Sequence, residues 1–178
     1  MRSAVGVLVA IVSAVGFAQQ QPVQPADALA RLLFMQGYWA GKQNFDTGGG
    51  PAMVGEATDN ISLCIEGKFV CEMLSTTLPG RKPTDTRHFI SFDKQTGKYT
   101  AWWFNDTSYH PTQFTGVLTG NRLVLMSDAS AAGPLLRATY ENPTPDKLTF
   151  QVEMKSGDKW TSLFVSTYTK GATAAAAK

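Results

Sequence analysis

The chain has 178 residues, which is enough for one domain with a substantial core. Its 16 Lys and Arg residues nearly balance its 14 Asp and Glu residues, so the net charge is only +2. This balance leaves no basic surplus for nucleic acid, and we expect no nucleic-acid partner.

The first 18 residues have the pattern of a secretory signal peptide. Met1 and Arg2 supply a positive start, residues 4–15 are almost entirely apolar, and Ala18 ends a small-residue cleavage pattern. The alternative, a membrane anchor, would need an apolar run of about 20 residues. We therefore expect cleavage after Ala18, export to the periplasm or the medium, and no transmembrane anchor in the mature chain.

The next elements follow from residue periodicity. Residues 19–25 are rich in Gln and Pro and predict a flexible leader. A short helix is predicted over residues 26–35, because Leu29, Leu32 and Leu33 share one helical face before Gly37 interrupts the pattern. Strands are then predicted over residues 39–46, 53–65, 68–78, 86–93, 98–105, 112–118, 122–127, 135–141, 147–155 and 159–169. The Ala-rich tail, residues 171–178, is predicted to be disordered.

This succession predicts the fold class. No long helical pattern separates any two strands, which excludes parallel βαβ units. An up-and-down meander of this length normally closes on itself, because closure removes its exposed edges. The chain is therefore predicted to be all-β: a closed antiparallel up-and-down β-barrel of about ten strands, over residues 26–170, with a short N-terminal helix. A two-sheet sandwich is the main alternative.

Two cysteines flank a predicted hairpin. A two-residue turn at Gly67 and Lys68 would place Cys64 directly opposite Cys71, on the same face of the sheet. An oxidising compartment would then permit a disulfide between them. The alternative is a pair of buried thiols that act as small apolar residues. The spacing fits no common zinc motif, so no metal site is expected.

One face of the fourth and fifth predicted strands carries no fixed charge. A four-residue loop at 94–97 pairs His88 with Trp103, Ile90 with Ala101, and Phe92 with Tyr99, all on that face. We assign this face to the barrel interior. Because an aromatic interior suits a small-molecule cavity, the tentative ligand-binding residues are His88, Ile90, Phe92, Tyr99 and Trp103.

Several short segments also share the layout of a known group of proteins: LFMQGYW at 33–39, EGKF at 66–69, HFISFD at 88–93, GKYTAWW at 97–103, LRATY at 136–140, and Tyr168. They resemble the lipocalin-like calycin superfamily, and within it a bacterial exported family of unknown function with a Gly-x-Trp-x-Gly opening motif. The resemblance covers roughly residues 29–170. It implies a barrel in which Trp39 plugs one end and Arg137 stacks on Trp39, both in structural roles. Related nitrobindins hold haem through a His near the C-terminus, whereas the segment Ser166-Thr167-Tyr168-Thr169 contains none, so no cofactor is expected.

No catalytic residues are predicted. The sequence has no Gly-x-Ser-x-Gly elbow, phosphate loop or dinucleotide motif, and its acidic residues are too scattered to nominate a carboxylate pair. We therefore favour an exported, non-catalytic barrel that binds a small apolar molecule in its lumen. Two alternatives stay open: a filled barrel that serves as a structural or envelope interaction module, and an isomerase or hydrolase that uses His88 and Tyr99. The oligomeric state is also left open.

Overall fold

In the computed structural model, the described residues are 23–106, 108–128 and 133–171. The predicted signal peptide, most of the predicted leader and all but Gly171 of the predicted tail lie outside them. No helix among the described residues is both long and apolar enough to cross a bilayer.

Two short helical segments open the described chain in place of the single helix predicted over 26–35. The α-helix α1 covers Pro25–Ala30, and a 3₁₀ turn, η1, covers Leu33–Met35. Backbone bonds from Leu32 to Leu29 and from Met35 to Leu32 tighten the chain between them. This tightening buries Leu29, Leu32 and Met35 but leaves Leu33 exposed, so the predicted face is wrong at Leu33.

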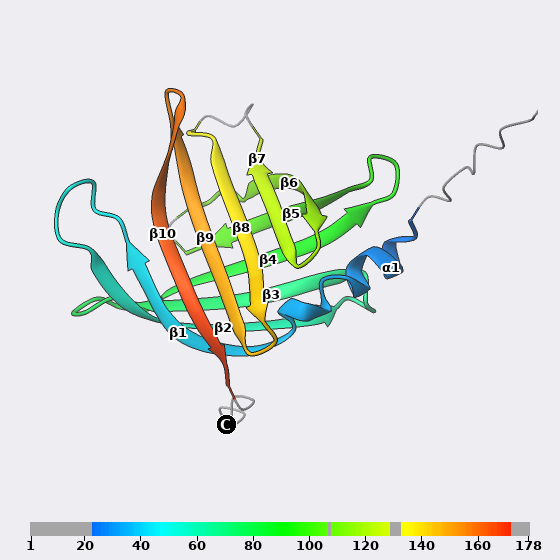
Figure 1. The fold of residues 1–178 in the computed structure, drawn as a ribbon, viewed down its shortest axis with the longest axis horizontal. Coiled ribbons are helices and arrows are strands. Elements are labelled where there is room, and N and C mark those ends of the chain that lie inside the picture. The colour runs from blue at the N-terminus through cyan, green and yellow to red at the C-terminus, as the bar shows by residue number, and fades with distance from the viewer. Residues whose placement is uncertain (1–22, 107, 129–132, 172–178) are drawn as a thin grey trace, which may run out of the picture.

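The remaining chain forms a closed antiparallel barrel (Figure 1), in the order β1-β10-β9-β8-β7-β6-β5-β4-β3-β2. The all-β barrel prediction is confirmed, and the sandwich alternative is excluded because β1 pairs with both β2 and β10. The strands of the described chain are β1 (Gly37–Phe45), β2 (Met53–Cys64), β3 (Phe69–Thr77), β4 (Thr84–Asp93), β5 (Lys98–Asn105), β6 (Thr112–Thr119), β7 (Arg122–Ser127), β8 (Leu136–Thr144), β9 (Lys147–Ser156) and β10 (Lys159–Lys170).

The two ends of the barrel differ. At one end, called here the helix end, α1 packs near β4 and the Tyr99 hydroxyl donates to the Ala28 carbonyl at 2.8 Å. Trp39 is fully buried there, and its Nε1 donates to the Met35 carbonyl at 2.7 Å. The β1–β2 and β3–β4 loops lie at the opposite end, called here the far end; the β1–β2 loop is seen on the side away from α1 in Figure 1.

The expected stacking of Arg137 on Trp39 is wrong. Ala138 and Tyr140 face the barrel interior, so the alternation along β8 turns Arg137 outward. There its guanidinium lies 4.3 Å from the Trp160 ring centroid and pairs with Glu153. The Trp39 ring is covered instead by Lys170, whose Nζ lies 5.3 Å from the ring centroid.

The Gly-x-Trp-x-Gly segment has a steric explanation. Gly37 takes a φ of 141°, a region that side chains rarely adopt, and begins β1. A Cβ on Gly41 would lie 1.9 Å from the Thr167 carbonyl oxygen. The glycine at 41 therefore allows β1 and β10 to approach closely where the barrel closes.

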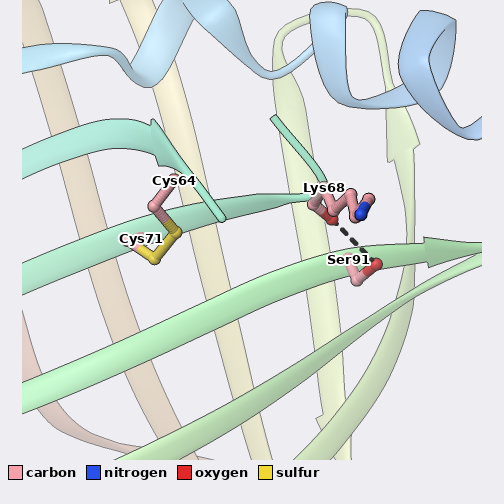
Figure 2. Close-up of a disulfide and its surroundings, with 4 residues drawn as sticks. All are labelled: Cys64, Lys68, Cys71 and Ser91. Atoms are coloured by element: carbon pink, nitrogen blue, oxygen red, sulfur yellow. Dashed lines mark hydrogen bonds between the residues drawn. A yellow bond between two sulfur atoms is a disulfide. The ribbon is translucent and has the colours of Figure 1, made fainter. Parts of the chain in front are cut away.

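Cys64 and Cys71 form a disulfide, with their Cα atoms 5.9 Å apart (Figure 2). The expected register was wrong by two residues, since Cys64 lies opposite Phe69 and Cys71 lies opposite Ser62. A shift of two residues keeps both cysteines on one face, and the bridge is therefore diagonal.

The register differs because the β2–β3 turn uses four residues, 65–68, instead of two. Ile65 and Glu66 both have positive φ, and Gly67 follows with a φ of 76°. Figure 2 also shows Ser91 donating to the Lys68 carbonyl, at 3.2 Å, which joins β4 to the end of this turn.

Candidate functional site

The structure places the predicted ligand-binding residues inside the barrel but not in one site. The β4–β5 register is as predicted, with His88 opposite Trp103 and Phe92 opposite Tyr99. His88 and Trp103 line a cavity toward the far end, whereas Phe92 and Tyr99 line a hollow at the helix end. Ile90 is completely buried in the core and lines neither.

The far-end cavity has a volume of about 210 Å³. Most of its lining is apolar or aromatic, and its polar groups belong to two threonines, one asparagine, one histidine and the indole N–H of Trp103. The lining residues are Leu74, Thr86, His88, Trp103, Asn105, Thr112, Leu136, Phe150, Val152, Leu163 and Phe164. Apolar walls with a few polar groups are typical of small-molecule sites.

A second cavity, of about 220 Å³, adjoins the first. The two share Leu74, Thr86 and Phe164, and the second extends to Arg81 and Lys82 of the β3–β4 loop. A longer ligand in the far-end cavity would therefore extend toward positive charge.

A buried polar cluster meets the far-end cavity at His88. The His88 Nδ1 lies 2.7 Å from Glu72 Oε2 and 2.9 Å from the Tyr140 hydroxyl. The Tyr140 hydroxyl donates to the same Glu72 oxygen at 2.7 Å. Since Glu72 is on β3, His88 on β4 and Tyr140 on β8, this cluster joins opposite walls of the barrel.

Asp59 adds a second carboxyl to the cluster. It is fully buried beside Glu72, and neither of its oxygens meets a donor group among the described residues. The two carboxyls can hydrogen-bond to each other only if one of them is protonated. Burial, then the charge of Glu72, raises the pKa of Asp59 well above its usual value. Burial likewise raises the pKa of Glu72, to about 7.

The proton of this pair belongs on Asp59. Glu72 Oε2 already accepts from Tyr140 and faces His88 Nδ1, and these contacts favour the carboxylate form of Glu72. Asp59 has no comparable donors. Above about pH 7, where Glu72 is ionised, the pair therefore holds one proton, on Asp59 beside the Glu72 carboxylate.

His88 is neutral in this environment. Burial lowers the pKa of His88 to about 3, against a smaller opposing effect of Asp59. Its ring stacks on Trp103 with a centroid separation of 4.2 Å, which fixes its orientation. Among the described residues, no hydrogen-bond partner occupies its Nε2. The Nε1–H of Trp103 is also buried without a partner in that part of the chain.

The interior acids were missed from the sequence, although a signal was present. On β3, Val70, Glu72 and Leu74 alternate with more exposed residues, so an acidic residue occupies a core-facing position. Asp59 has the same place on β2, between Ala57 and Ile61. Their meeting with Tyr140 depends on barrel closure, which no local pattern encodes.

The hollow at the helix end is larger, about 430 Å³, but its chemistry is that of an ordinary surface. Exposed residues 94–97 of the β4–β5 loop and Arg31 make up half of its lining, and the other half is Val23, Phe92, Tyr99, Val117 and Leu118. The Tyr99 hydroxyl beside it is already bonded to Ala28. Across the described chain, no group of three or more His, Cys, Asp and Glu side chains is arranged to hold a metal ion.

Residues 24–170 match a protein family described as a protein of unknown function, DUF1579. This chain belongs to the DUF1579 family. No curated protein sequence matches it. Because the DUF1579 family is described as of unknown function, membership assigns no activity to this chain.

The solved structures that resemble this DUF1579 barrel include the following two. Rv2717c from M. tuberculosis has a TM-score of 0.63 and 14% identity, covering 84% of this chain and 100% of that chain. The S-type phycobiliprotein lyase CPES from Guillardia theta has a TM-score of 0.58 and 9% identity, covering 89% of this chain and 99% of that chain. At these identities the likeness shows the fold alone, which fits the calycin-like barrel implied by the sequence.

Proposed function

We propose that this DUF1579 protein binds a small, largely apolar molecule in the far-end cavity. The observation that carries the proposal is an aromatic cavity with a buried, oriented histidine in its wall. Phe150 and Phe164 supply the apolar contact area, while His88 supplies a polar contact. This combination gives both the binding energy and the orientation that a small-molecule site requires.

The volume limits the ligand. An apolar cavity of about 150 Å³ in another protein holds benzene, and this cavity has about 210 Å³. It therefore suits a single ring with one or two small substituents. A larger ligand would have to extend into the adjoining cavity toward Arg81.

The geometry does not favour catalysis by His88 and Tyr99. The two side chains line different cavities, and the Tyr99 hydroxyl is bonded to Ala28. Burial also keeps the pKa of His88 far below neutral, which makes His88 a weak base for proton abstraction at neutral pH.

The test uses a matched pair of cavity-filling variants. Leu163 lines the far-end cavity, Leu118 lines the helix-end hollow, and both are half-buried. We expect ligand-observed NMR to show that para-xylene binds the wild type and Leu118→Trp, but not Leu163→Trp. Circular dichroism checks that both variants fold.

Two results would count against the proposal. Loss of binding in Leu118→Trp alone would move the site to the helix end. Failure of the wild type to bind any single-ring compound would remove the support for a small-ligand role and favour the filled-barrel module. Native mass spectrometry of protein purified from its own host would identify a retained molecule.

We also infer that the protein is exported. The support is the signal-like pattern of residues 1–18, together with a disulfide, which persists in oxidising compartments. The mature protein should then have the mass of the chain without residues 1–18. A full-length mass from intact protein in the cytoplasm would refute the inference.

A further inference from the structure

The cluster next to the far-end cavity determines where the hydrogen of His88 lies. The Tyr140 hydroxyl donates a hydrogen bond to Glu72 Oε2. Above about pH 7 Glu72 is a carboxylate, and its oxygens then accept hydrogen bonds but carry no hydrogen to donate. The His88 Nδ1, which is 2.7 Å from the same oxygen, must then carry the hydrogen and donate it. A neutral imidazole with its hydrogen on Nδ1 has its lone pair on Nε2.

The proton of the carboxyl pair does not disturb this tautomer. Glu72 Oε1 is buried without a donor group as partner among the described residues, and the Asp59 carboxyl interacts with the Glu72 carboxyl. The shared proton therefore lies between Asp59 and Oε1, on the side of Glu72 away from His88. The contacts from Glu72 and Tyr140 thus fix both the tautomer and the orientation of the His88 ring, as hydrogen-bond partners do for other functional histidines.

We propose that the far-end cavity selects molecules with a neutral hydrogen-bond donor, such as a one-ring phenol or alcohol, whose hydroxyl donates to His88 Nε2. This inference rests on the proposed ligand-binding function and specifies the ligand class of the same site. Apolar rings from Trp103 and Phe150 surround the ring of the ligand, while Nε2 receives its hydroxyl. An anionic group at this position would face a lone pair with the Glu72 carboxylate behind it, so anions are rejected.

The experiment compares ligands that differ at one group. The hydroxyl of para-cresol replaces one methyl of para-xylene, and para-methylanisole carries an oxygen that accepts but cannot donate. Because the three differ in their transfer from water, the informative quantity is the change in their affinity ratio between proteins. The key variant is His88→Asn, whose amide NH₂ can still donate to Glu72 but which has no acceptor at the Nε2 position.

Isothermal titration calorimetry should show that the preference for para-cresol over para-xylene falls about tenfold in His88→Asn, the value of one good hydrogen bond. The ratio of para-methylanisole to para-xylene should stay within about threefold. Tyr140→Phe disturbs the same cluster without removing Nε2, so it should keep the para-cresol preference. In the wild type, the ¹⁵N signal of Nε2 should shift on para-cresol binding, a readout that needs no variant.

The outcomes separate this inference from the proposal on which it rests. If the ratio of para-cresol to para-xylene affinity is equal in wild type and His88→Asn, and para-xylene still binds, donor selection is overturned and the apolar site stays intact. If His88→Asn loses as much affinity for para-methylanisole as for para-cresol, each relative to para-xylene, then Nε2 of His88 donates a hydrogen bond, which also overturns the inference. If no compound binds the wild type, the binding function and the inference both fail.

Discussion

Replacing Glu72 by Gln should flatten the dependence of stability on pH. Burial raises the pKa of Glu72 from 4.5 to about 7 in the folded protein, so the folded state binds this proton more tightly than the unfolded state. The contribution is therefore most favourable below pH 4.5 and is lost as the pH rises through about 7. Gln cannot titrate, and the variant lacks this loss.

The magnitude follows from the width of that window. Each pH unit between the two pKa values is worth about 1.4 kcal/mol, so the shift from 4.5 to about 7 corresponds to about 3 kcal/mol. Solvent does not screen this contribution, because Glu72 is fully buried. Glu72 also contributes to the raised pKa of Asp59, so its removal changes the profile in the same direction.

The neighbouring groups do not reverse this sign. Burial lowers the pKa of His88 from 6.5 to about 3, so its contribution is lost as the pH falls through that range. His88 is present in both proteins, and its contribution cancels in the difference between them. Tyr140 and Tyr168 have pKa values raised by burial and stay neutral throughout.

Urea unfolding followed by tryptophan fluorescence, in steps from pH 4.5 to 8.5, measures both profiles. The wild type should lose about 3 kcal/mol more than Glu72→Gln across this range. Glu56→Gln is the control, because Glu56 is exposed and its replacement should leave the profile parallel to the wild type. Parallel profiles for Glu72→Gln would refute the raised pKa. Carboxyl ¹³C titration of the wild type tests the same point without a variant.

Two further predictions concern the barrel itself. Replacing both Cys64 and Cys71 by Ser should lower the free energy of unfolding by about 2 kcal/mol, as expected for a bridge with a sequence separation of 7; equal urea midpoints for variant and wild type would contradict this. Gly41→Ala should lower the free energy of unfolding by about 1–3 kcal/mol, because its Cβ would overlap the Thr167 carbonyl. Thermal melts measure this loss, and Gly133→Ala, whose Cβ would meet open space, should leave the melting temperature unchanged.

Much of the architecture was predictable because strand identity is local. Alternation of side chains and turn residues located the strands within a few residues, and the loop at 94–97 set the β4–β5 register that brings His88 and Trp103 together. For the β2–β3 pair, the sequence predicted which face each side chain occupies but not which residues lie opposite each other. The turn between β2 and β3 has positive φ at Ile65 and Glu66, and residues of these types rarely adopt that conformation, so the sequence does not predict it.

The tertiary structure decided the site. Whether two inward side chains meet across a barrel depends on strand tilt and closure, which combine all ten strands and appear in no single segment. Those global terms bring Glu72 of β3 to Tyr140 of β8. The sequence alone determined that the interior would be aromatic; closure of the barrel determined that Glu72 and Tyr140 would meet and orient its histidine.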